Sequence, residues 1–207
     1  MVKQDGKAVY LQQGNALSVT DMQNDFLPGG ALGVPEGDKI IPFVNRAAAL
    51  FKKNNLPIFF TRDWHPPDHC SFKDQGGPWP PHCVQNTAGA ELSSKMNIPE
   101  GSVIISKGSD KNSEQYSTLG GRDAAGNTES SLLKKSGIKR IFIAGLATDY
   151  CVLNSVKDAL AEGYEVYVLT DAIRAVDVNP GDGERALEEM IRGGAKTITT
   201  EGIREKK

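Results

Sequence analysis

The chain has 207 residues, of which 39% are hydrophobic and 24% are charged, and its formal net charge is −2. These values are typical of one globular domain that is long enough to bury a core. The sequence contains no basic stripe of the kind that binds nucleic acid and no apolar run of about 18 residues that would span a membrane. We therefore expect a single domain over residues 1–207, with neither nucleic acid nor a membrane as a partner.

Residues 1–14 are polar and lack the apolar segment of a signal peptide, so we expect a cytoplasmic protein. They form either a loose tail or an added hairpin through residues 8–11. The three cysteines are an odd count without the spacing of a disulfide framework, so each is judged as a free thiol. The sequence leaves the oligomeric state open, and a homo-oligomer is compatible with it.

Short apolar runs alternate with amphipathic stretches along the chain. The apolar runs predict six strands, at residues 16–20, 57–61, 103–106, 140–144, 165–169 and 196–199. The amphipathic stretches predict helices at residues 38–54, with Asp38 as the N-cap, and at 128–136, 149–162 and 183–192. Such alternation is typical of a parallel sheet covered on both faces. We predict a three-layer α/β sandwich with a mainly parallel six-stranded sheet and helices on both faces.

Side chains able to do chemistry follow four of the predicted strands. In chain order they are Asp21, then Asp63 and His65, then Lys107, and finally Cys151. Ligands of parallel α/β sheets bind outside the carboxyl ends of the strands. We therefore expect these side chains to meet at one site.

A metal site is predicted beyond the second strand. Asp63 and His65 share a face, because residues two apart in extended chain point the same way. His82 lies in the long segment 66–101, which holds few regular elements and is typical of a functional loop. One carboxylate and two imidazoles suit one divalent ion, for which we expect zinc, with iron and manganese as alternatives.

The competing interpretation of this region is a set of surface loop histidines. All three histidines of the chain lie here, and this clustering favours the metal site. His69 is either a further ligand, direct or through water, or a residue that supports the ligands.

Cys151 is the candidate nucleophile. It lies where a buried strand turns into a helix, and free backbone N–H groups at that point favour a thiolate and can bind an oxyanion. The alternative is a buried structural cysteine, which is how we interpret Cys70 and Cys83. Because the histidines belong to the metal region, Asp21 is the candidate base. Lys107 is expected to hold Asp21 ionised and to lower the pKa of the thiol.

Five segments carry a resemblance to a known family. They are DMQNDF at residues 21–26, DWH at 63–65, WPPHC at 79–83, SKG at 106–108 and GLATDYCV at 145–152. In this order and spacing they resemble the isochorismatase-like hydrolases and, within that superfamily, the nicotinamidase/pyrazinamidase family. The resemblance extends over residues 16–201.

The resemblance implies a catalytic triad and a metal centre. The triad is Cys151, Asp21 and Lys107, and the metal ligands are Asp63, His65 and His82. It also implies a cis peptide bond before Ala147, which directs the amides of Ala147 and Cys151 into an oxyanion hole. The residues that it places around the substrate ring are Phe26, Trp79, Tyr116, Leu146 and Tyr150.

The activity implied by the resemblance is the hydrolysis of nicotinamide to nicotinate and ammonia through a cysteine thioester, a step of NAD salvage. Pyrazinamide is an expected second substrate. In the family, the metal binds the pyridine nitrogen and orients the ring.

Two features depart from the family pattern. Some members have a further histidine ligand where this chain has Ser71, so we expect three protein ligands plus water. Ser18 and Thr20 occupy strand positions that are usually apolar, and the sequence offers no functional account of them.

Three other functions compete with this interpretation. An amidohydrolase of N-carbamoyl compounds would share the triad but lack the metal ligands. Isochorismatase itself would lack Cys151. A binding or scaffold protein would have no need of an intact triad.

Overall fold

A computed structural model describes residues 8–205 of the chain. Its main sheet has six strands in the order β4-β3-β2-β5-β6-β7, and each neighbouring pair is parallel. The strands are β2 (Asn15–Thr20), β3 (Ile58–Asp63), β4 (Val103–Lys107), β5 (Arg140–Leu146), β6 (Glu165–Arg174) and β7 (Lys196–Ile198). The predicted parallel six-stranded sheet is confirmed.

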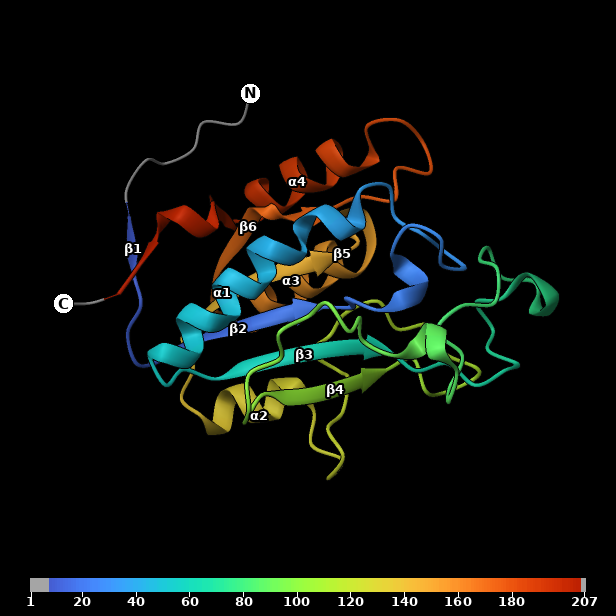
Figure 1. The fold of residues 1–207 in the computed structure, drawn as a ribbon, viewed down its shortest axis with the longest axis horizontal. Helices are drawn as coiled ribbons and strands as arrows, with labels where there is room; N and C mark the ends of the chain where they lie inside the picture. Colours follow the sequence, from blue (N-terminus) through green and yellow to red (C-terminus); the bar gives the residue numbers. More distant parts are fainter. Residues whose placement is uncertain (1–7, 206–207) are drawn as a thin grey trace.

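The direction in which the sheet grows reverses between β2 and β5. From β2 the chain adds β3 and β4 on one side, and it then returns to place β5, β6 and β7 on the other. Parallel α/β sheets bind their ligands outside the carboxyl ends of the strands at such a switch point. In Figure 1 the arrowheads of β2, β3 and β4 point to the right, toward the loops that surround this edge.

Helices cover both faces of the sheet, as predicted. They are α1 (Ile41–Lys53), α2 (Glu129–Lys135), α3 (Leu153–Ala161) and α4 (Asp182–Arg192). Helix α1 packs on one face, where the ring of its Phe51 meets the ring of Phe142 of β5 edge-on at 5.3 Å. Helices α2, α3 and α4 contribute to the apolar cluster of the opposite face through Leu133, Val156 and Met190. Figure 1 shows α1 in front of the sheet and α3 behind it.

Two predicted helix starts were wrong. Helix α1 begins at Ile41, and Asp38 lies in a preceding 3₁₀ turn, Gly37–Ile40, without capping the helix. The second is the predicted helix over 149–162, which opens with a π-helical turn at Thr148–Val152 before α3. In this wide turn the amides of Tyr150 and Val152 both donate to the carbonyl of Ala147, at 3.1 Å each. Periodicity cannot reveal such a turn, because it contains too few residues.

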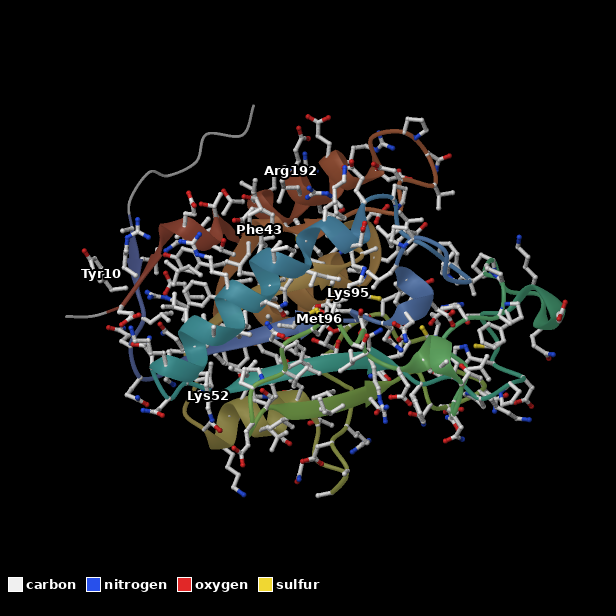
Figure 2. All side chains as sticks on the ribbon, viewed as in Figure 1. Tyr10, Phe43, Lys52, Lys95, Met96 and Arg192 are labelled. Carbon is white, nitrogen blue, oxygen red and sulfur yellow. The ribbon has the colours of Figure 1, made fainter. Side chains whose placement is uncertain are left out.

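The ends of the described chain form a separate two-stranded ribbon. Strand β1 (Val9–Tyr10) pairs in parallel with β8 (Ile203–Arg204), so residues 8–11 do not form a hairpin. Figure 2 shows Tyr10 at the end of the molecule opposite the carboxyl ends of the strands, and 54% of the residue is exposed. The rest of the proposed tail, residues 1–7, lies outside the described residues.

A membrane crossing requires a long apolar helix, and no helix within residues 8–205 has both the length and the apolar character for it.

The structure accounts for Ser18, the polar residue in the middle of β2. Its hydroxyl donates a 2.7 Å hydrogen bond to Oε1 of Glu129, the first residue of α2, and both residues are buried. Burial raises the pKa of Glu129, although the hydrogen bond from Ser18 opposes the rise. The strand thus carries a hydroxyl because a carboxyl group is buried against it. No comparable partner accounts for Thr20, whose hydroxyl makes no hydrogen bond to the described residues.

The raised pKa of Glu129 predicts a pH-dependent stability. A carboxyl group whose folded-state pKa is raised contributes stability below its unfolded pKa and loses it as the pH rises through the folded pKa. The variant Glu129→Gln cannot ionise, so its stability relative to the wild type should increase as the pH rises above 4.5, the ordinary pKa of a glutamate. The free energy of urea unfolding, measured across this range, checks the prediction.

The exposed Glu100 offers a matched control, since Glu100→Gln should not change the pH dependence of stability. An equal pH dependence in the wild type and in Glu129→Gln would contradict the prediction.

Candidate active site

A cavity of about 380 Å³ lies at the carboxyl ends of the central strands. Its lining combines the polar residues Asp63, His65, His82 and Cys151 with the aromatic residues Phe26, Trp79, Tyr116 and Tyr150. A lining that combines apolar rings with a few convergent polar groups is typical of sites for small molecules. The structure therefore brings most of the predicted site residues to one place.

Lys107 connects the candidate triad with the candidate metal ligands. Its Nζ lies 2.9 Å from Oδ2 of Asp21 and 3.4 Å from the sulfur of Cys151, and it also donates to Oδ1 of Asp63. The residue is 1% exposed, so these contacts are shielded from water. Because Asp63 and Lys107 are register partners on β3 and β4, the sheet itself sets the last of these contacts.

Burial and charge together set the protonation of this group. Burial raises the pKa of Asp21, and the charge of Lys107 opposes the rise only in part. Burial likewise raises the pKa of the Cys151 thiol well above its ordinary value, although the charge of Lys107 opposes this rise. Burial would lower the pKa of Lys107, but Asp21 and Asp63 hold it well above its usual range. Burial thus opposes the thiolate that the helix start was expected to favour at Cys151, whereas the two carboxylates favour the charged form of Lys107.

A threonine that the sequence analysis missed holds Asp21 in place. The hydroxyl of Thr61, on the neighbouring β3, donates a 2.6 Å hydrogen bond to Oδ1 of Asp21, which leaves Oδ2 to face Lys107. Asp21 also has a positive φ of 49°, which is uncommon outside glycine and concentrates at functional sites.

Gly145 allows β5 to approach β2 beside Asp21. Its φ is +110°, and an added Cβ would lie 2.0 Å from the carbonyl oxygen of Thr20. Only glycine fits this position, which brings the segment leading to Cys151 close to the base.

The three candidate metal ligands converge. Asp63, His65 and His82 are buried, and one ligand atom of each lies within 4.8 Å of the others. The Nδ1 of His65 donates to the carbonyl of Gly108 at 2.9 Å, and the Nδ1 of His82 donates to the carbonyl of Pro80 at 2.8 Å. A carbonyl can only accept, so both rings carry their proton on Nδ1 and leave the Nε2 lone pair for a cation.

The charge states of Asp63 and His82 also suit a divalent cation. Burial would raise the pKa of Asp63, but Lys107 and His65 hold it below its ordinary value, so the carboxylate stays ionised. Burial lowers the pKa of His82, which favours the neutral ring that binds metals. The residues therefore fit a metal ion of the kind held by one carboxylate and two imidazoles.

His69 lies beside the ligands without joining them. Its ring is 4.2 Å from that of His65, centroid to centroid. Its Nδ1 pairs with the hydroxyl of Ser71 at 2.7 Å, and its Nε2 donates to the carbonyl of Ser113 at 3.2 Å. Both ring nitrogens are thus occupied, an arrangement consistent with a supporting role.

The other two cysteines differ from each other. Cys83 is fully buried, and burial raises the pKa of its thiol well above the ordinary value. Its amide donates to Oδ2 of Asp25 at 2.7 Å, which fixes the loop after His82. Cys70 is only half-buried, so the expectation of a buried thiol was wrong for this residue, which sits in an irregular loop.

Gln23 is a second residue that the sequence analysis missed. Its side-chain amide accepts from the amide of Asp63 at 2.7 Å and donates to the carbonyl of Asp63 at 2.8 Å. It also donates to the carbonyl of Ala90 at 2.8 Å. A glutamine two residues beyond Asp21 carries no signal for this role except its place in the motif at 21–26.

Aromatic side chains wall the cavity. The indole N–H of Trp79 donates to the hydroxyl of Tyr116 at 3.1 Å, and the Trp79 ring meets that of Tyr150 edge-on at 4.9 Å. Phe26 packs against the ring of His82 at 5.5 Å. These contacts fix flat apolar surfaces next to the metal ligands, as a planar ring would require.

Of the site residues predicted at the turn after β5, Ala147 and Cys151 line the cavity and Leu146 does not. The peptide bond between Leu146 and Ala147 is cis, and both Ala147 and Cys151 line the cavity, where their amides were expected to form an oxyanion hole. Leu146 does not line the cavity, because its side chain is fully buried in the core beneath α1.

Comparison with known proteins agrees with this geometry. Residues 15–202 match the isochorismatase domain family. A nicotinamidase of Acinetobacter baylyi is 37% identical over an alignment of 214 positions, which covers 93% of this chain and 97% of the relative.

Two solved structures extend the agreement to three dimensions. A pyrazinamidase of Pyrococcus horikoshii in complex with zinc is 50% identical with a TM-score of 0.83, and the match covers 90% of this chain and 99% of that one. PnC1 from L. infantum in complex with nicotinate is 32% identical with a TM-score of 0.86, and the match covers 96% of this chain and 100% of that one. From its matched domain, its relatives and its fold, the chain belongs to the isochorismatase family.

Proposed function

We propose that this chain is an amidohydrolase that converts nicotinamide into nicotinate and ammonia through a thioester on Cys151, all within one domain. One observation carries the proposal. Cys151, Asp63, His65 and His82 line a single cavity, and the buried ammonium of Lys107 contacts both the sulfur of Cys151 and the carboxylate of Asp63. The reaction is a step of NAD salvage.

Asp63, His65 and His82 are the proposed ligands of one divalent metal ion. When bound there, the ion supplies an open coordination position that a ring nitrogen can fill. We propose zinc, which the pyrazinamidase neighbour holds, although the same three ligands also suit iron or manganese.

The first half of the proposed reaction forms the thioester. The thiol is protonated at rest, so Asp21 accepts its proton as the sulfur of Cys151 attacks the amide carbon. The raised pKa of Asp21 makes it a stronger base than an exposed carboxylate. The amides of Ala147 and Cys151 are proposed to bind the oxyanion. Asp21 then passes the proton to the departing nitrogen, and ammonia leaves.

The second half hydrolyses the thioester. Asp21 accepts a proton from a water molecule as the water oxygen attacks the thioester carbon. The carbon–sulfur bond breaks, the proton returns to Cys151, and nicotinate is released. Lys107 keeps its charge through both halves, so it offsets the negative charge that moves between Asp21 and the reacting atoms.

The lining of the cavity supports a small neutral aromatic amide as the substrate. Phe26, Trp79 and Tyr116 offer flat surfaces suited to a six-membered ring. Among the described residues that line the cavity there is no lysine or arginine to bind a phosphate, and Glu114 adds a negative charge. The free base is therefore favoured over a nucleotide. The three metal ligands favour this reaction over the hydrolysis of N-carbamoyl compounds.

A comparison of nicotinamide with benzamide tests the proposed function. Benzamide has the same shape and the same amide group but no ring nitrogen. We expect the metal-loaded protein to hydrolyse nicotinamide and pyrazinamide rapidly, and to have a kcat/KM for benzamide that is lower by about 100-fold or more. Ammonia release measures all three rates.

Equal rates on nicotinamide and benzamide would contradict the proposal that the metal orients the substrate through its ring nitrogen. Turnover of an N-carbamoyl amino acid, but not of nicotinamide, would overturn the proposed substrate.

Replacing the nucleophile should abolish hydrolysis while the fold persists. We expect Cys151→Ala to reduce kcat by at least about 1,000-fold, because no thioester can form. Asp21→Asn should cause a comparable loss, since the members of a triad act as a unit. Cys70→Ser is the matched control, because Cys70 does not line the cavity, and it should retain activity. More than a few per cent of wild-type activity in Cys151→Ala would contradict the assignment.

The proposed metal site predicts unequal effects of two histidines. His82→Ala removes a converging ligand and should empty the site, whereas His69→Ala removes a neighbour whose ring nitrogens already bond to Ser71 and Ser113. Elemental analysis after dialysis gives the metal content per chain, independently of activity. The three-ligand site is wrong if His69→Ala loses as much metal as His82→Ala.

A further inference from the structure

One wall of the cavity is held by a residue outside the proposed triad and the proposed metal ligands. The segment 175–181 connects β6 with α4 and crosses beside the cavity, and we call it the strap. Val176 of the strap lines the cavity and packs against the apolar core cluster that includes Phe26. The position of Val176 therefore sets the room available to a ring in the cavity.

The carboxylate of Asp149 binds two consecutive amides of the strap. Its Oδ1 accepts from the amide of Val176, and its Oδ2 accepts from the amide of Asp177, each at 2.9 Å. Hydrogen bonds to a charged carboxylate are about twice as strong as neutral ones. Asp149 belongs to the π-helical turn Thr148–Val152, which also carries Tyr150 and Cys151. One side chain thus ties the cavity wall to the turn of the nucleophile.

Contacts with α4 hold the residues on either side of Val176. Oδ1 of Asp177 accepts from the amide of Gly183 at 2.8 Å, and Asp177 itself has a positive φ of 52°. An added Cβ on Gly183 would lie 2.4 Å from the Cβ of Ala175, so the strap packs tightly on the start of the helix. Among these contacts, the Asp149 carboxylate is the one that binds the amide of Val176 itself.

We propose that Asp149 is a positioning residue that fixes the Val176 wall and thereby sets which ring-substituted carboxamides the cavity accepts. The proposal rests on the proposed function and goes beyond it, because Asp149 touches neither the triad nor the metal ligands through any hydrogen bond described above. A fixed wall rejects a ring that carries an extra methyl group at the position facing Val176. A released wall admits it.

The central experiment compares Asp149→Asn with Val176→Ala. An asparagine keeps the size of the side chain but replaces one accepting oxygen with a donor, so at least one strap bond is lost. Val176→Ala shortens the wall directly. Both variants and the wild type are assayed on nicotinamide and on its four ring-methylated forms.

We expect kcat/KM for one methylated form, relative to nicotinamide, to rise at least about fivefold in both variants and at the same ring position, since one methyl group in a pocket changes discrimination by about 10-fold or more. For nicotinamide, Asp149→Asn should raise KM more than it lowers kcat. In the double variant, the relative kcat/KM for the methylated form should be close to that of the better single variant, because both changes act on the same wall.

Asp171 provides a matched control. Its carboxylate also binds a loop amide, that of Thr200, at 2.9 and 3.0 Å, but it does not line the cavity. Asp171→Asn should leave the preference among the methylated substrates unchanged. Any loss of stability common to both aspartate variants is thereby separated from an effect on the wall.

Hydrogen exchange of the Val176 and Asp177 amides provides a test that needs no substrate. Exchange should accelerate in Asp149→Asn and not in Asp171→Asn. The proposal is overturned if exchange is unchanged, or if the wild type hydrolyses nicotinamide while Asp149→Asn lowers kcat without altering the substrate preference. No hydrolysis of nicotinamide by the wild type would instead contradict the proposed function, and exchange would still decide the role of Asp149.

Discussion

The site depends on one buried positive charge. Lys107 is 1% exposed and contacts both Asp21 and Asp63, two carboxylates that are themselves almost fully buried. Oxygens of these two residues lie within 4.8 Å of each other, and two unpaired carboxylates so placed in an apolar interior could not both ionise. With the ammonium between them, Asp63 stays charged as a ligand while Asp21 keeps the raised pKa of a base. The lysine therefore allows two different acid–base environments in one small volume.

The sheet topology explains why these groups meet. Parallel strands end at a common edge, and the growth of the sheet reverses between β2 and β5. Asp21 directly follows β2 and Cys151 follows β5, while Asp63 and Lys107 are register partners on β3 and β4. Gly145 lets the two central strands approach. Few side chains have to be placed by long loops, and those that are, such as His82, are fixed by hydrogen bonds to backbone carbonyls.

Much of this arrangement was predictable from the sequence, because strand ends are visible as the ends of apolar runs. The strands, the triad and the ligand candidates all follow from that signal and from the motifs. Thr61, Gln23 and Glu129 were not predictable, because their roles depend on hydrogen bonds between strands or loops that are distant in sequence. Leu146 was expected to contact the substrate because it lies in the same motif as Ala147 and Cys151. Its side chain instead packs into the core. The sequence motif does not show whether the side chain of Leu146 faces the cavity or the core.

The shared lysine also means that the proposed triad and the proposed metal ligands are not independent parts. Asp63 directs Oδ1 to Lys107 and Oδ2 to within 3.6 Å of Nε2 of His65, so its orientation depends on both partners. Removing the lysine would leave two buried carboxylates without a counter-charge and would free Asp63 to turn. Loss of activity in a Lys107 variant would therefore mix a catalytic effect with a change in the metal site. Substitutions of Cys151 and of His82 separate the catalytic effect from the effect on the metal site. Unlike Lys107, neither residue joins the two halves of the site.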